Sequence, residues 1–176
     1  MDVFEAIARR HSYRGEYLPQ VVLREHLQQI VQAGIDAPSG CNAQTTSFVI
    51  VDDPELIAKI VAIVDRPFLK RVPALIFCVA DHRPVYQGCS FAVEDCAAAT
   101  ENMLLTITAL GYATVWLDGA LRVEDRKKRI GHLLGVPPDK EVRVLLPVGV
   151  PKEIVKPREK LPFAKRAWFN GCGLAS

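Results

Sequence analysis

The apolar residues of this chain recur with two different spacings, and each spacing predicts a different kind of element. Leu23, Leu27, Ile30 and Val31 stand at i, i+4, i+7 and i+8, which places them on one face of a helix. Short continuous apolar runs predict buried strands instead. The whole pattern predicts five helices (one capped by Asp2, one after Pro19, and 54–64, 91–110 and 123–134) and strands over 48–51, 74–79, 112–117 and 142–150.

The length and the order of these elements limit the fold. A chain of 176 residues is long enough to bury one core, and no repeat, low-complexity tract or linker divides it. Helices come first and then alternate with strands, which predicts a single α/β or α+β domain. Neither G-x-G-x-x-G nor G-x-x-x-x-G-K-S/T occurs, so the two commonest nucleotide-binding signatures are absent. The helix 91–110 is apolar on more than one face, which places it in the core or at a subunit interface.

The sequence indicates a cytoplasmic protein without a membrane partner. The longest charge-free apolar run, 103–117, is shorter than the ~18 residues that span a bilayer, and the first residues lack the pattern of a signal peptide. Five cysteines form no C-x-x-C pair, which predicts neither a disulfide framework nor a zinc site. Glu94, Asp95 and Glu101 share a helix, but the E-x-x-H motifs of a di-metal bundle are missing. We therefore expect no bound metal.

The net charge of +2 conceals an uneven distribution. Residues 1–150 hold 16 basic and 18 acidic side chains, whereas residues 151–176 hold 6 basic and 2 acidic ones. The small total gives no reason to expect a nucleic-acid binder, although a basic tail that contacts RNA is one alternative. The basic run 126–129 fits a solvated helix face. The tail is therefore either a solvated C-terminus or a segment that folds back to meet an anion.

Two segments near the N-terminus carry side chains suited to an anion and a polar heterocycle. Arg10, Ser12 and Arg14 alternate, so in an extended segment they point to one side and offer guanidinium and hydroxyl donors to a phosphate. The alternative is an ordinary basic helix end. The segment 37–44, Ala-Pro-Ser-Gly-Cys-Asn-Ala-Gln, combines a serine with two carboxamides that can bind a heterocycle edge, or is simply a turn.

Two further segments lie in the second half of the chain. Trp116-Leu117-Asp118-Gly119 ends a predicted strand, where the glycine lets a ligand or another backbone come close. Lys156-Pro157-Arg158 lies in the basic tail, and both cations can reach one anion. Each segment alone also fits an ordinary turn or a solvated tail.

Taken together, the four segments resemble the FMN-dependent nitroreductase family in order and spacing. The family pattern is R-x-S-x-R/K, A-P-S-x-x-N-x-Q, a glycine at a strand end and K-x-R near the C-terminus. Here it reads Arg10-x-Ser12-x-Arg14, the loop 37–44, Gly119 and Lys156-x-Arg158. The resemblance runs from Phe4 to Gly173. It implies an α+β sandwich with a central, mostly antiparallel sheet flanked by helices, acting as a homodimer with FMN at the interface.

The resemblance also implies a role for each motif residue. Arg10, Ser12, Lys156 and Arg158 would hold the FMN phosphate. His11 would lie near the ribityl or phosphate end, and Arg14 by the pyrimidine edge, where a cation stabilises reduced flavin. Backbone of the strand end would pass the ring, with an N–H directed at flavin N5, and the loop would come from the partner subunit. The implied cofactor-binding set is Arg10, His11, Ser12, Arg14, Pro38, Ser39, Asn42, Gln44, Trp116, Leu117, Asp118, Gly119, Lys156 and Arg158.

The implied activity is hydride transfer from NAD(P)H through FMN N5 to an acceptor such as a nitroaromatic or a quinone, by a ping-pong mechanism. No side-chain acid or base is expected, because the cofactor carries the chemistry. A flavin-binding protein without NAD(P)H turnover and a specialised flavin reaction of the same superfamily are the alternatives. The physiological acceptor and the choice among NADH, NADPH and a protein electron donor stay open.

The sequence departs from the family pattern at several positions. Gln44 is followed by Thr45 and Thr46 where the family often has Pro-Trp. No amide stands before the second strand for the pyrimidine edge, and either Arg66 or Lys70 could replace it. Cys41 lies inside the loop, as an inert or a redox-exposed thiol. The short chain lacks room for helices that would cover the acceptor, so we expect an open acceptor site.

Overall fold

A computed structural model describes residues 1–173 and contains a three-stranded antiparallel sheet in the order β1-β2-β3. The strands are β1 (Thr46–Val51), β2 (Ala74–Asp81) and β3 (Lys140–Val148). The helices are α1 (Val3–Arg9), α2 (Arg24–Ile35), α3 (Pro54–Val64), α4 (Ala92–Ala109) and α5 (Arg126–Leu133). The predicted α+β class with an antiparallel sheet is confirmed.

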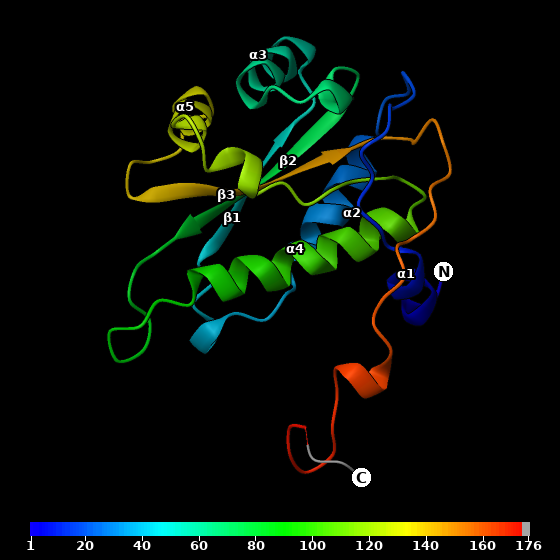
Figure 1. Ribbon diagram of the computed structural model, residues 1–176. Coiled ribbons are helices and arrows are strands. Elements are labelled where there is room, and N and C mark those ends of the chain that lie inside the picture. Colours follow the sequence, from blue (N-terminus) through cyan, green and yellow to red (C-terminus); the bar gives the residue numbers. More distant parts are fainter. Residues whose placement is uncertain (174–176) are drawn as a thin grey trace.

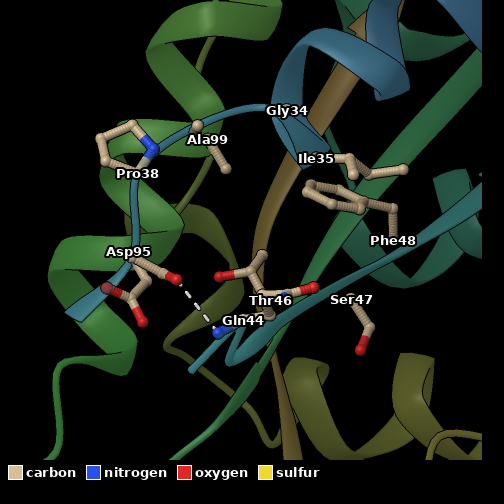
Figure 2. Close-up of a pocket in the computed structure, with 11 residues that line it drawn as sticks. Gly34, Ile35, Pro38, Gln44, Thr46, Ser47, Phe48, Asp95 and Ala99 are labelled. Carbon is tan, nitrogen blue, oxygen red and sulfur yellow. Dashed lines mark hydrogen bonds between the residues drawn. The ribbon is translucent and has the colours of Figure 1, made fainter. Parts of the chain in front are cut away.

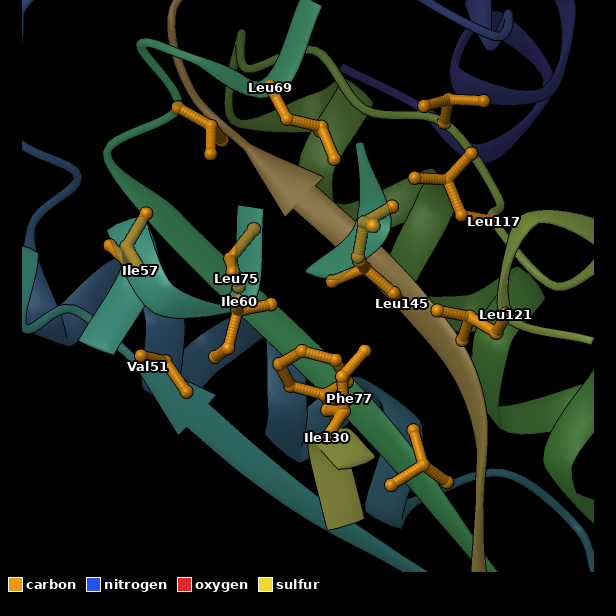
Figure 3. Close-up of a cluster of buried hydrophobic side chains, with 14 of the residues drawn as sticks. Val51, Ile57, Ile60, Leu69, Leu75, Phe77, Leu117, Leu121, Ile130 and Leu145 are labelled. Atoms are coloured by element: carbon orange, nitrogen blue, oxygen red, sulfur yellow. The ribbon is translucent and has the colours of Figure 1, made fainter. Parts of the chain in front are cut away.

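Helices cover both faces of the sheet, so the central strand β2 is buried on both sides (Figure 1). Leu75 and Phe77 enter a cluster with α3 and α5 that Figure 3 shows in close-up. Ile76 and Cys78, which alternate with them, enter a second cluster with α2 and α4. Full burial of a large apolar side chain contributes about 1.5–3 kcal/mol, so this two-sided burial holds the layers together.

Local signals in the sequence set several helix ends. The Asp2 carboxylate accepts a hydrogen bond from the Glu5 N–H at 2.9 Å, and the Asp53 carboxylate accepts one from the Leu56 N–H at 2.7 Å. Gly111, just beyond α4, has the left-handed φ of 82° that glycine adopts without strain. Helix α5 begins three residues later than predicted. Glu124 and Asp125 are the cause, because both have left-handed backbones.

The segment 112–117, predicted as a strand, pairs with β3 only through two isolated antiparallel bridges, Ala113 with Gly149 and Leu117 with Leu145. Hydrogen bonds of 2.9–3.4 Å form at both bridges. Midway between them stands Pro147, which has no N–H to donate toward Val115. The prediction of a regular strand is therefore wrong at its centre. The cause lies thirty residues away in the sequence.

The β2–β3 ladder contains a bulge at Arg143. Cys78 pairs with Val144 whereas the next residue, Val79, pairs with Val142, so Arg143 is the extra residue. A bulge alters the alternation of a strand and can redirect one side chain. The Arg143 guanidinium is directed toward the Asp118 carboxylate, 3.6 Å away, instead of into an apolar cluster.

The tail beyond Pro151 leaves the body of the molecule, as the orange to red segment of Figure 1 shows. A 3-10 turn lies in it at Phe163–Lys165. Large apolar side chains along it are exposed, among them Ile154 at 100% and Phe169 at 83%. Within residues 1–173, no helix combines the length and the apolarity needed to cross a membrane.

Candidate functional site

The buried side chain of Tyr13 anchors the segment that carries Arg10, Ser12 and Arg14. The Tyr13 N–H donates to the Thr114 carbonyl at 2.8 Å. The Tyr13 hydroxyl donates to the Glu16 carbonyl at 2.5 Å and accepts from the Lys152 N–H at 3.1 Å. Ser12 and Arg14, on either side of this fully buried ring, are exposed. Tyr13 therefore turns its two neighbours outward, in agreement with the predicted alternation.

The same anchor joins the first motif to the start of the basic tail. The Lys152 N–H donates to the Glu16 carbonyl at 3.0 Å, and the Lys152 ammonium lies 2.8 Å from the Glu16 carboxylate. The side-chain hydrogen bond from Lys152 holds the pKa of the Glu16 carboxyl below its usual range. Lys156 and Arg158 follow a few residues later and are exposed, and no ion pair of either is found within residues 1–173.

Arg10 and His11 are less exposed than the donors beside Tyr13. The Arg10 guanidinium lies 3.5 Å from the Glu101 carboxylate of α4, and 23% of its side chain is exposed. The His11 Nδ1 lies 3.0 Å from the Arg9 carbonyl, within hydrogen-bond distance. The two residues thus continue the basic segment toward α4.

The strand end Trp116–Gly119 begins two residues after Thr114, to which Tyr13 is bonded. Trp116 packs against the cluster under α4, and Leu117 packs on the opposite side of the sheet. The Asp118 carboxylate pairs with Arg122 and Arg143. The hydrogen bond from Arg122 and the nearby charge of Arg143 outweigh burial and hold the pKa of Asp118 below its usual range. A Cβ atom placed on Gly119 would meet nothing within 4 Å, so the space above it is open.

The loop 37–44 is folded into a strained turn at the N-terminal end of α4. Cys41, Asn42 and Gln44 have φ of 52°, 54° and 51°, a left-handed conformation that asparagine tolerates and that cysteine and glutamine rarely adopt. The Ser39 hydroxyl oxygen accepts a hydrogen bond from the Gln44 N–H at 3.0 Å, drawn as the dashed line in Figure 2. Pro38 and Ser39 line a small cavity of about 260 Å³ with Thr46 and Asp95. The Asn42 and Gln44 side chains are exposed.

The structure does not choose between Arg66 and Lys70 for the missing amide. Both are exposed in the segment between α3 and β2. Lys70 lines an open, largely apolar groove of about 760 Å³ between α3 and the segment 19–21. The Cys41 thiol is exposed, and all five cysteines are free. Among residues 1–173, no group of three or more His, Cys, Asp or Glu side chains could hold a metal ion.

Comparison with known proteins gives this arrangement a family. The family model described as "Nitroreductase family" matches residues 7–65 and 62–150, which is most of the chain. The chain belongs to the nitroreductase family. The predicted resemblance to this family is thereby confirmed.

Nitroreductase relatives resemble the chain over nearly its whole length. An Archaeoglobus fulgidus protein, provisionally named NADH dehydrogenase/NAD(P)H nitroreductase, is 33% identical over 153 residues, which cover 86% of this chain and 87% of the relative. The solved FMN-dependent nitroreductase of Clostridium difficile R20291 is 26% identical with a TM-score of 0.82, over 96% of this chain and 99% of that one. The Vibrio harveyi NADPH:FMN oxidoreductase, solved with NAD⁺, superposes with a TM-score of 0.84 over 99% of this chain and 79% of that one, and at 19% identity this likeness concerns the fold alone.

Within this nitroreductase fold, three charged residues contact the motif segments, although the sequence pointed to Asp95 and Glu101 only as candidate metal ligands and did not point to Arg143. Glu101 pairs with Arg10, Arg143 faces Asp118, and Asp95 accepts hydrogen bonds from the loop 37–44 and Thr45. Each contact joins residues at least 25 positions apart. The buried position of Asp95, on the apolar side of a helix, was the one local signal that could have singled it out.

Proposed function

We propose that this protein is an FMN-dependent NAD(P)H oxidoreductase of the nitroreductase type. The observation that carries the proposal is the anchoring of Tyr13 between Thr114 and Lys152. It fastens a segment with two guanidiniums and a hydroxyl both to the chain just before the strand end and to the start of a basic tail. The names of the relatives, an NAD(P)H nitroreductase and an FMN-dependent nitroreductase, support the same activity.

The donor set fits FMN. A phosphate that is nearly a dianion suits forked guanidinium donors and a neutral hydroxyl, and one segment supplies these, with Ser12 and Arg14 exposed and Arg10 partly exposed beside Glu101. Lys156 and Arg158 would add two more cations from the tail. We propose that Arg10, Ser12, Lys156 and Arg158 hold the phosphate, with His11 beside its ribityl end.

The remaining motif residues would hold the ring. FMN, when bound, supplies the hydride-transfer chemistry, so the protein contributes binding and orientation. Arg14 would place positive charge at the pyrimidine edge, which favours the reduced cofactor. A backbone N–H of the strand end Trp116–Gly119 would donate to the ring, and the open space above Gly119 leaves room for it. Asn42 and Gln44 would offer carboxamides to the ring or ribityl chain, with Pro38 and Ser39 shaping the loop.

We propose further that the working unit is a homodimer and that residues 1–176 form one FMN-binding unit within each subunit. Support comes from the apolar side chains that a single chain leaves exposed on α1 and on the tail, such as Phe4 at 81% and Phe169 at 83%. In a dimer the tail would close the phosphate site and the loop 37–44 would serve the partner's flavin. The free cysteines fit a reducing cytoplasm.

Turnover would be ping-pong, with a nicotinamide and then an acceptor occupying one site in turn. A quinone or a nitroaromatic is the proposed acceptor class. No segment among residues 1–173 closes over the exposed donors, which fits an open site with broad acceptor tolerance.

The test has three arms. Purified protein should carry FMN, bound FMN should be bleached anaerobically by NADH or NADPH, and NAD(P)H should be consumed in the presence of a quinone or nitroaromatic. The double variant Arg10→Ala with Arg158→Ala should lose FMN and keep the fold. The variant Lys128→Ala with Arg129→Ala removes the same charge from the exposed face of α5 and should keep FMN. Bound FMN that neither nicotinamide bleaches would exclude the self-sufficient enzyme.

A further inference from the structure

Asp95 is a buried carboxylate whose two hydrogen bonds go to Gly40, inside the loop 37–44, and to Thr45, directly after it. Its side chain lies on α4 and the residue is 5% exposed. One oxygen accepts from the Gly40 N–H at 2.8 Å, and the other accepts from the Thr45 hydroxyl at 2.5 Å. Burial of an ionised carboxylate is costly unless hydrogen bonds satisfy it, so these contacts fix both partners closely.

The two partners bracket the strained part of the loop. Between Gly40 and Thr45 lie Cys41, Asn42 and Gln44, all with left-handed backbones. Such conformations persist only where the surroundings hold them. The loop's own bonds, including the Asn42 N–H to the Ser39 carbonyl at 2.9 Å, close the turn internally. From outside the loop, the Arg83 guanidinium donates to the Ala43 carbonyl at 2.6 Å and the Asp81 N–H donates to the Thr45 carbonyl at 2.9 Å. Asp95 adds the fastening of Gly40 and Thr45 to α4.

The packing around Gly40 leaves the loop little freedom on that side. A Cβ atom at Gly40 would lie 2.4 Å from the Phe91 ring, so the backbone of the loop packs directly on the side chain of the N-cap residue of α4. Thr45 is buried at 1% exposure and uses its hydroxyl for Asp95. Its role here accounts for a threonine at a position where the family often has proline.

We propose that Asp95 is a positioning residue of the flavin site. By holding Gly40 and Thr45, it sets the loop in which Asn42 and Gln44 face outward, before any ligand arrives. The inference rests on the proposed function, because it assigns the loop to FMN. It differs from a purely structural role for Asp95, which would affect the stability of α4 and leave the loop and its ligand unaffected.

The experiment compares three variants in hydrogen exchange of the FMN-free protein and in FMN titration. Asp95→Asn keeps the volume and removes the negative charge, so both bonds lose their charge assistance and the Thr45 hydroxyl must accept from an amide N–H instead of donating. Thr45→Val keeps the volume and removes one bond, and it serves if Asp95→Asn folds poorly. Asn102→Ala is the matched control, since Asn102 lies on the same helix and donates to the Ala33 carbonyl at 3.0 Å.

The Asp95→Asn variant should exchange the amides of 40–44 faster and bind FMN roughly ten- to a hundredfold more weakly, with Thr45→Val in the same direction and smaller. Asn102→Ala should lower the melting temperature and leave both readouts at the wild-type level. Unchanged exchange of 40–44, or faster exchange with unchanged FMN affinity, would overturn the positioning role. A wild-type protein that binds no FMN would overturn the proposed function and this role with it, whatever the exchange arm shows about the loop.

Discussion

The loop 37–44 and the tail 152–173 are both assigned to FMN sites, yet within a single chain one is held in place and the other is not. The loop is held by Asp95, by Ser39 and by packing against Phe91. The tail exposes its cations and its large apolar side chains together. The loop is therefore fixed by contacts within one subunit, whereas the tail would need a ligand or a second subunit to hold it.

Removal of the tail should give the largest effect and would test this contrast directly. A variant ending at Val155 should bind FMN at least a hundredfold more weakly, because it lacks Lys156 and Arg158, the two tail cations proposed to bind the phosphate. Its FMN-free melting temperature should change by only a few degrees, since nearly all of the removed side chains that the structure describes, those within 156–173, are exposed. Flavin titration and thermal unfolding measure the two quantities. A large loss of stability in the monomer would show that the tail is part of the subunit's own fold.

Gly40→Ala should perturb the opposite region. The new methyl group would clash with the Phe91 ring and destabilise the protein by about 1–3 kcal/mol. Adding Phe91→Ala should remove the clash and restore part of the lost stability. Gly131→Ala is the matched control, because its Cβ would make only ordinary contacts at 3.7 Å and alanine favours the helix α5. Denaturant unfolding of the three variants and the wild-type protein measures the effect, and equal losses for Gly40→Ala and Gly131→Ala would count against a crowded loop.

Glu101→Gln should act outside the loop and the tail, at Arg10 of the proposed phosphate site. Loss of the carboxylate 3.5 Å from the guanidinium removes negative charge beside the proposed phosphate site, so FMN affinity should rise about two- to fivefold at low salt. The gain should shrink as salt screens the charges. Glu94→Gln, on the same helix and exposed, should give no gain. A loss of affinity in Glu101→Gln would show instead that Glu101 holds Arg10 in place.

The smallest effect is expected at Asp118, in the strand end between the two regions. Its carboxyl pKa is lowered in the folded state by the Arg122 hydrogen bond and by Arg143. The carboxylate therefore stabilises the fold above its unfolded pKa of about 3.9, and the contribution is lost as the pH falls below that value through the folded pKa. Asp118→Asn should cost less than about 1 kcal/mol at pH 7 and nothing near pH 2. Chemical unfolding at both pH values measures the difference, which should not grow on acidification.

Much of the fold could be predicted from local sequence. Asp53 followed by Pro54 gives α3 the same bounds in prediction and structure, and Gly111 marks the end of α4 as expected. The strand 112–117 was predicted as regular because its own residues are apolar. Its pairing depends on Pro147, and the bulge at Arg143 likewise arises from the register between strands. Local patterns carry no information on such register.

The candidate site divides in the same way. Arg10, Ser12 and Arg14 could be named from their alternation, and the burial of Tyr13 explains why the alternation points them outward. The link from Asp95 to Gly40 joins residues 55 positions apart, and no spacing rule connects them. A carboxylate on an apolar helix face could be noticed in the sequence, but its partners become visible only when the chain is folded.

The left-handed backbone of the loop has a consequence for which residues can occupy it. Glycine adopts such angles freely, whereas another residue costs roughly 1 kcal/mol or more at each position. Cys41 and Gln44 stand where glycine would fold more readily. Both residues are exposed, so each presents its thiol or carboxamide to solvent from a strained backbone. Substitution of either by glycine should therefore remove the backbone strain and stabilise the fold, while the exposed thiol or carboxamide and its contribution to function are lost.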